Sequence, residues 1–147
     1  MAPVFRNSFV FAMLALVLFF TDLYAYFFIG SYLLTGILAL YATTVARQFS
    51  PVPIIYLLAF STLESFFFYG YAALQFIITI PALVIAMRLR TAFYNPTVFS
   101  SFLILSMLLV QSTIIETYLL NMPFSPAFTI SKLCINLILT IMISLKY

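Results

Sequence analysis

Residues 97–120 read TVFSSFLILSMLLVQSTIIETYLL and contain a single charged residue, Glu116. A helix that spans a membrane needs about 20 consecutive, mostly apolar residues, so this segment is long enough to cross a bilayer. Only helices and closed barrels pair all their backbone amides within lipid, and barrel strands alternate polar and apolar side chains. The run from Leu103 to Val110 does not alternate. The segment therefore predicts a transmembrane α-helix.

The rest of the chain has the same character. Of its 147 residues, 66% are hydrophobic and 6% are charged, whereas soluble proteins carry about a quarter charged residues. With no histidine, one cysteine and three glycines, the chain lacks the material for most metal sites, histidine-based triads and phosphate-binding loops. Its six basic residues are too scattered to bind nucleic acid. Composition predicts an all-α, multi-pass membrane protein that is not an enzyme and has no cofactor or nucleic-acid partner.

Turn residues divide the chain into segments of membrane length. Proline, glycine and asparagine interrupt the apolar runs at residues 50–53, 70, 94–97 and 121–126, and Thr21-Asp22 is typical of a helix start. We therefore predict one transmembrane domain of six helices, at residues 4–20, 22–47, 51–69, 71–90, 97–120 and 126–146. A first break near Gly30-Ser31 fits almost as well, because Asp22 is the only charge between residues 7 and 46.

The basic residues indicate how these helices are oriented. With six crossings, one face of the bilayer receives five of the six cations: Arg6, Arg47, Arg88, Arg90 and Lys146. Basic residues are enriched on the cytoplasmic side of membrane proteins. The sequence therefore predicts that both termini are cytoplasmic, with Lys132 as the one cation near the outer side.

The remaining charges lie toward that outer side. Asp22 falls at the predicted first outer turn, and Glu64, Glu116 and Lys132 lie one or two helical turns inside an outer loop. Charged side chains at this depth face the bundle interior, pair with one another or line a wet cavity. We expect Lys132 to pair with Glu116 or Glu64. With the polar residues that share their helix faces, they predict an intramembrane polar centre of Glu64, Gln75, Ser112, Glu116, Lys132 and Asn136.

The role of these polar residues stays open at this point. The centre is interpreted as helix packing, as a structural ion pair, or as a cavity for a ligand or ion that opens to the outside. A second pattern consists of small residues at four-residue spacing, which let another helix approach closely: Ser31, Thr35, Ala39 and Thr43. This ridge predicts packing within the bundle, with a partner subunit as the alternative.

From residue 51 onward the order of features resembles MreD, a small membrane protein of the bacterial rod-shape machinery. Leu63-Glu64, Gly70 and Met87-Arg88-Leu89-Arg90 are similar to its acidic helix end, glycine turn and basic helix end. The patch from Gln111 to Glu116, the loop from Asn121 to Pro126, and Lys146 follow in the same order. The chain departs from the pattern in having Glu64 where an aspartate is usual, and Ser65-Phe66 where Ser-Gly is usual.

This resemblance implies a non-enzymatic scaffold in the inner membrane of a bacterium, working with MreC, MreB, RodA and a penicillin-binding transpeptidase in cell-wall elongation. MreD also looks like the substrate-binding S components of energy-coupling-factor transporters, which implies a small-molecule-binding membrane subunit as a second possibility. The composition fits a third equally well, a small hydrophobic accessory subunit of a respiratory or other membrane complex.

Overall fold

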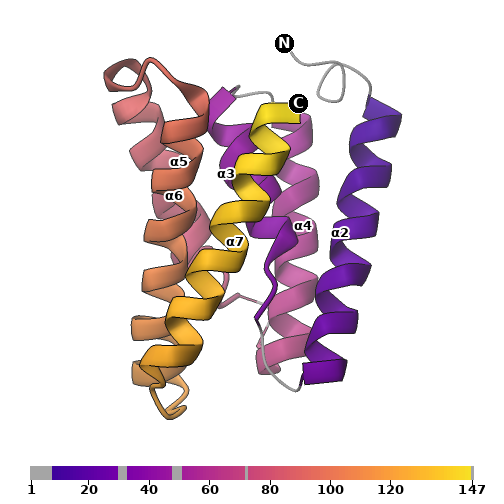
Figure 1. The fold of residues 1–147 in the computed structure, drawn as a ribbon. Coiled ribbons are helices and arrows are strands. Elements are labelled where there is room, and N and C mark those ends of the chain that lie inside the picture. Colours follow the sequence, from indigo (N-terminus) through magenta and orange to yellow (C-terminus); the bar gives the residue numbers. More distant parts are fainter. Residues whose placement is uncertain (1–7, 30–32, 48–50, 72, 147) are drawn as a thin grey trace.

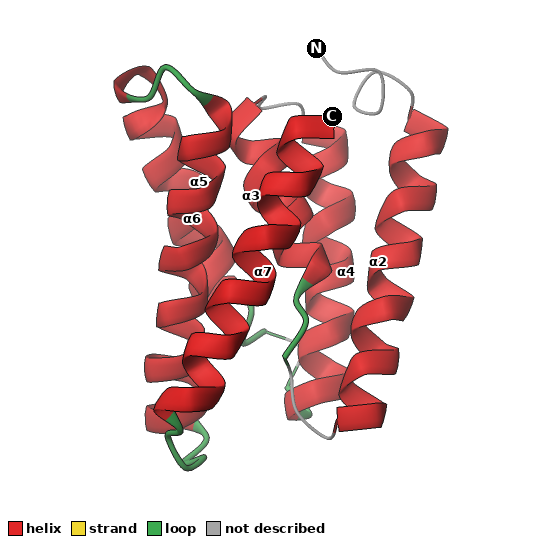
Figure 2. Cartoon of the chain, viewed as in Figure 1, coloured by secondary structure: helices red, strands yellow, loops and turns green. Residues whose placement is uncertain are grey.

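The computed structural model describes residues 8–29, 33–47, 51–71 and 73–146, and these ranges contain helices and no strand (Figure 2). The α-helices are α2 (Ser8–Ile29), α3 (Gly36–Arg47), α4 (Pro51–Tyr69), α5 (Phe76–Leu89), α6 (Pro96–Val110) and α7 (Pro126–Lys146). A 3₁₀ turn, η1 (Arg90–Ala92), follows α5, and a π-helix, η2 (Gln111–Leu119), continues α6. The helices stand side by side as one bundle (Figure 1). The predicted all-α class is confirmed.

Four helical segments are long and apolar enough to cross a membrane: Phe9–Ile29, Pro51–Tyr69, Pro96–Leu119 and Pro126–Leu145. The other two, α3 with 12 residues and α5 with 14, are shorter. At 1.5 Å per residue they extend about 18 and 21 Å, less than the roughly 30 Å of a hydrocarbon core. The chain therefore has the helices of a multi-pass membrane protein, and six full crossings stay a prediction.

The predicted first boundary at Thr21-Asp22 is wrong. Helix α2 continues through both residues to Ile29, and α3 begins at Gly36 after the non-helical residues 33–35. The alternative break, Gly30-Ser31, lies outside the described residues, between these two helices. Asp22 does cap a helix, but the helix is α3, because its carboxylate accepts hydrogen bonds from the first two amides of that helix. A sequence identifies a capping side chain without saying which helix end it meets.

Two other boundaries differ less. The helix expected at residues 71–90 begins only at Phe76, after a turn that ends in Gln75. The helix expected at 97–120 is continuous from Pro96 to Leu119 but changes from α to π at Gln111.

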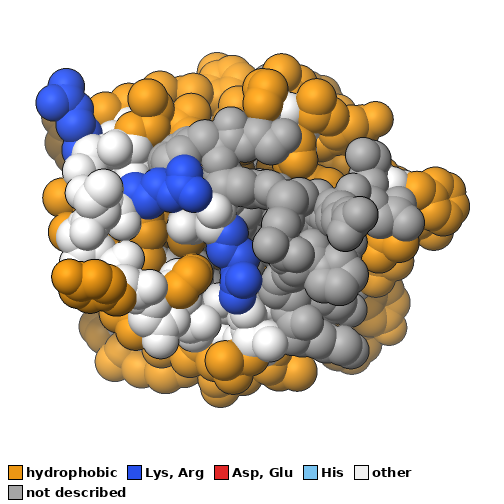
Figure 3. All heavy atoms as spheres, turned by 90° about the horizontal axis from the view of Figure 1, so that it is seen from above, with side chains coloured by type: hydrophobic (Ala, Val, Ile, Leu, Met, Phe, Trp, Pro, Cys, Tyr) orange, Lys and Arg blue, Asp and Glu red, His pale blue; other side chains and the backbone are white. Residues whose placement is uncertain are grey.

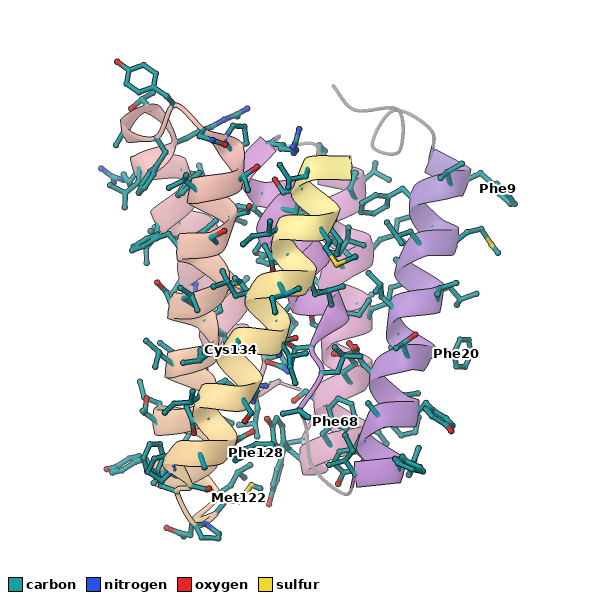
Figure 4. The ribbon with its side chains drawn as sticks, viewed as in Figure 1. Phe9, Phe20, Phe68, Met122, Phe128 and Cys134 are labelled. Atoms are coloured by element: carbon teal, nitrogen blue, oxygen red, sulfur yellow. The ribbon has the colours of Figure 1, made fainter. Side chains whose placement is uncertain are left out.

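Helix α3 is the centre of the bundle. Every residue from Gly36 to Ala46 is buried, and α3 packs against α2, α4, α5, α6 and α7. Outer helices instead direct aromatic rings away from the bundle: Phe9 and Phe20 of α2 are 72% and 60% exposed (Figure 4), whereas Phe68 of α4 is buried. Lipid requires such an apolar exterior. The central helix, α3, carries the small residues that permit close packing.

Gly36 lies where α3 packs tightly against α2. A Cβ at this position would lie 3.0 Å from Asp22 Oδ1 and 3.0 Å from Leu18 Cδ2. We expect Gly36→Ala to lower the free energy of unfolding by about 1–3 kcal/mol, the usual cost of overpacking a tight interior. The measurement is thermal unfolding in a mild detergent.

Gly70 provides the matched control for that substitution. Its φ of +77° favours glycine, but a Cβ there meets nothing within 4 Å. Gly70→Ala should cost about 1 kcal/mol through backbone strain alone. A Gly36→Ala protein more stable than the Gly70→Ala protein would contradict the close approach of α2 and α3.

Arginine side chains gather at one end of the bundle, where α2 begins and α7 ends (Figure 3). Arg90 Nη2 donates to the carbonyl oxygen of Arg47 at 2.7 Å, and Arg47 in turn donates to the carbonyl oxygen of Ser144 on α7. Arg88 is exposed on the last turn of α5. Arg6 and the side chain of Lys146 lie outside the described residues. The three described arginines therefore lie at one end of the bundle, and the cytoplasmic side for that end stays a prediction.

Candidate functional site

Buried polar side chains from α2, α4, η2 and α7, with the residues just before α3 and α5, form the candidate site, which is called the polar centre. Each is 3% exposed or less: Asp22, Thr35, Ser61, Glu64, Ser65, Gln75, Gln111, Ser112, Lys132 and Asn136. Glu116 joins them with a side chain that is 12% exposed. All six residues predicted for this centre therefore face the interior, whereas Thr113, one residue after Ser112, is exposed. Burying polar groups at membrane depth costs free energy unless they bond to one another.

Lys132 and Glu116 form an ion pair inside the bundle. Lys132 Nζ lies 3.3 Å from Glu116 Oε1, and the Lys132 side chain is fully buried. Tyr69 at the end of α4 donates its hydroxyl hydrogen to the same oxygen at 2.9 Å. The sequence left Glu116 and Glu64 open as partners of Lys132, and the structure shows the pair with Glu116. One carboxylate thereby joins α4, η2 and α7.

The π-helix η2 determines where Glu116 points. Its hydrogen bonds reach back five residues, as in the bond from Leu120 N to the Ile115 carbonyl oxygen at 3.0 Å. The wider turn of a π-helix brings side chains four and five apart near one face, and both Gln111 and Glu116 reach the interior. In an α-helix, that face would have held a residue three or four positions away from Glu116. Short π segments often occur at functional sites, and no feature of the sequence indicated this one.

Asp22 binds the amino terminus of α3. Its Oδ1 accepts from Gly36 N at 2.7 Å and its Oδ2 from Ile37 N at 3.1 Å. A helix amino terminus carries unpaired amides and partial positive charge, so it is a natural site for a carboxylate. The side chain of Glu64 on α4 is hydrogen-bonded to Asp22.

Asn136 forms hydrogen bonds with the non-helical backbone that precedes α3. Its Oδ1 accepts from Thr35 N at 2.8 Å, and its Nδ2 donates to the carbonyl oxygens of Leu33 at 2.8 Å and Lys132 at 2.7 Å. Irregular backbone is tolerated at membrane depth only where protein groups or water satisfy it. Asn136 and Asp22 together therefore allow α3 to begin inside the bundle.

The predicted small-residue ridge also lies in the interior. Thr35, Ala39 and Thr43 are all fully buried on or just before α3, and Ser31 lies outside the described residues. The Thr43 hydroxyl donates to the carbonyl oxygen of Ala39 at 2.9 Å, so it needs no partner on another helix. This burial agrees with packing inside the bundle and not with an exposed subunit contact.

Asp22 and Gln111 of the polar centre, and Tyr69 that bonds to Glu116, were not predicted for this site. Asp22 was expected in an outer turn, and Gln111 was named only as the start of the patch that resembles MreD. The signal for Asp22 was its position as the only charge in forty residues, since an isolated charge so far from any loop usually has an interior partner. Gln111 and Tyr69 carried no comparable signal.

Comparisons of the chain with protein-family models, with curated proteins and with solved structures find no match.

Proposed function

We propose that this chain is a non-enzymatic scaffold subunit of the bacterial cell-shape and wall-elongation machinery, of the MreD kind. In this proposal it crosses the inner membrane six times, with both termini and the arginine end of the bundle in the cytoplasm. Its outer helix faces and cytoplasmic ends bind MreC, RodA and a transpeptidase.

The observation that supports this proposal most is that Asp22, Asn136 and the Glu116–Lys132 pair of the polar centre are bonded within the bundle. Asp22 is hydrogen-bonded to the start of α3, and Asn136 is hydrogen-bonded to the backbone of residues 33–35. Glu116 is paired with Lys132 and accepts a hydrogen bond from Tyr69. Interhelical bonds of this kind hold helices in register, and buried ionic groups often give specificity of arrangement rather than net stability. A bundle fixed in this way presents constant outer surfaces to its partners, as a scaffold requires.

The test is depletion of the protein in the bacterium that encodes it, followed by microscopy and by affinity purification in mild detergent. We expect rod-shaped cells to become round, and we expect wall-elongation proteins to co-purify with a tagged chain. Restoring the wild-type chain should restore the rods. Cells that keep their shape after depletion would contradict the proposal. Co-purification with a respiratory complex would contradict it too and would indicate an accessory subunit of that complex.

A second candidate function is binding of a small molecule, as in a transporter S component. The observation that favours it is a set of buried hydroxyl oxygens that bond to no other atom of the described residues: Thr35 Oγ1, Ser61 Oγ and Ser112 Oγ. Each such group costs about 1–3 kcal/mol, which a polar ligand would recover. A ligand at a hundred times its Kd would stabilise the purified protein by about 2.7 kcal/mol. This candidate would be excluded if none of a panel of vitamins raised the thermal unfolding temperature.

A further inference from the structure

An apolar groove opens on the outer surface of the bundle between α5 and α6. Ile77, Pro81 and Ile85 form one wall, and Phe102 and Val110 lie on the other. The only polar side chain in its lining is Ser106, whose hydroxyl is already bonded to the carbonyl oxygen of Phe102 at 2.8 Å. The groove therefore offers an occupant apolar contact and no hydrogen bond.

The wall formed by α5 leads to a cation. Ile77, Pro81, Ile85 and Arg88 follow one another at spacings of three or four residues, so they lie along one face of the helix. Arg88 is exposed at the arginine end of the bundle. On the α6 side, the rings of Phe93 and Phe102 stack, with their centroids 5.7 Å apart.

The length of this face matches one leaflet of a bilayer. Ile77 and Arg88 are eleven residues apart, about 16 Å along a helix. Half of a hydrocarbon core is about 15 Å. If Arg88 lies at the headgroup level, the groove extends to about the middle of the membrane.

We propose that this groove binds one acyl chain of an anionic phospholipid, whose phosphate pairs with Arg88. The apolar walls match the acyl chain, and the Arg88 guanidinium matches the phosphate. The length of the α5 face from Ile77 to Arg88 matches a single leaflet. A protein helix would fill the groove equally well with apolar side chains, but it would match Arg88 only if it also carried an acidic residue at that end. Arg90 is less suited to the phosphate, since its Nη2 is bonded to the Arg47 carbonyl oxygen.

The chain contains no tryptophan, so one introduced tryptophan reports on a single place. Phe102→Trp puts the reporter in the groove, and Phe20→Trp puts a matched reporter on the outer face of α2, where Phe20 is 60% exposed. Each variant is reconstituted in phosphatidylcholine vesicles that contain either phosphatidylglycerol with brominated acyl chains or brominated phosphatidylcholine, at equal mole fraction. Bromine quenches tryptophan only at close range.

For Phe102→Trp we expect the brominated anionic lipid to be bound about fivefold more tightly than brominated phosphatidylcholine, the factor that one arginine contributes near an anionic surface. Adding Arg88→Gln should abolish the preference, and Phe20→Trp should show none. Equal quenching by both lipids at position 102, or a preference that survives Arg88→Gln, would overturn the proposal. Quenching by neither lipid at position 102 would do so too, because it would mean that another protein segment fills the groove.

Discussion

Replacing Lys132 by methionine is expected to lower the free energy of unfolding by about 3–5 kcal/mol, because it leaves the carboxylate of Glu116 without its cation inside the bundle. The two groups are 3.3 Å apart, and the Lys132 side chain is completely buried. Methionine fills a similar volume, so the loss reports the missing charge rather than a cavity. The measurement is thermal unfolding in mild detergent, with yield from the membrane fraction as a second readout.

Two further variants identify the pair as the cause. Ser131→Ala changes the neighbouring exposed hydroxyl, which bonds only to the Ala127 carbonyl oxygen, and should change stability by less than about 0.5 kcal/mol. Combining Lys132→Met with Glu116→Gln removes both charges and should recover part of the loss. A Lys132→Met protein that inserts and unfolds like the wild type would show that the ion pair does not hold α7 to η2.

Replacing Asp22 by alanine should cost about 2–4 kcal/mol, more than the loss of an ordinary helix cap. A cap on an exposed helix is worth about 1 kcal/mol, but the amides of Gly36 and Ile37 are buried and would keep no acceptor. Asp22→Asn retains one acceptor oxygen and should cost about half as much. Thermal unfolding in the same detergent measures both.

The adjacent Thr21 is the natural control for Asp22. It lies on the exposed side of α2, and its hydroxyl bonds to the Val17 carbonyl oxygen within its own helix. Thr21→Ala should leave stability within about 0.5 kcal/mol of the wild type. If Asp22→Ala were equally mild, the start of α3 would not depend on Asp22.

The sequence predicted those parts of the fold that follow from segment length and turn residues. The helices at residues 51–69 and 126–146 were predicted with the bounds they have, since prolines stand at their starts and their apolar runs end at the next turn. The first boundary failed because Asp22 was interpreted as a cap for the residues that follow it in the chain, whereas it caps a helix fourteen residues further on.

The members of the polar centre were predictable in part, and their contacts less so. Charge and helical spacing indicated that Lys132 and Asn136 face inward, because lipid excludes them from the outside. Spacing along one helix does not say which atoms of another helix they reach, so the bonds of Asn136 to residues 33–35 came only from the structure. The same holds for the π-helix, which is a property of the packed bundle and not of local propensity.

A disulfide between α2 and α3 tests whether the short helix α3 begins in the interior of the bundle, beside α2. The Leu18 Cβ lies 3.2 Å from the position of a Cβ at Gly36, close to the separation of about 3.5–4.5 Å in a disulfide. If a helix instead started at residue 22, positions 18 and 36 would be about 18 Å apart along the helix axes. Leu18→Cys with Gly36→Cys, in a Cys134→Ser background, should therefore form a disulfide on mild oxidation, detected by mass spectrometry of the linked peptides. The pair at Leu18 and Ile29, about 16 Å apart on α2, should not. Absence of the 18–36 link in inserted protein, or equal linking of both pairs, would contradict the account.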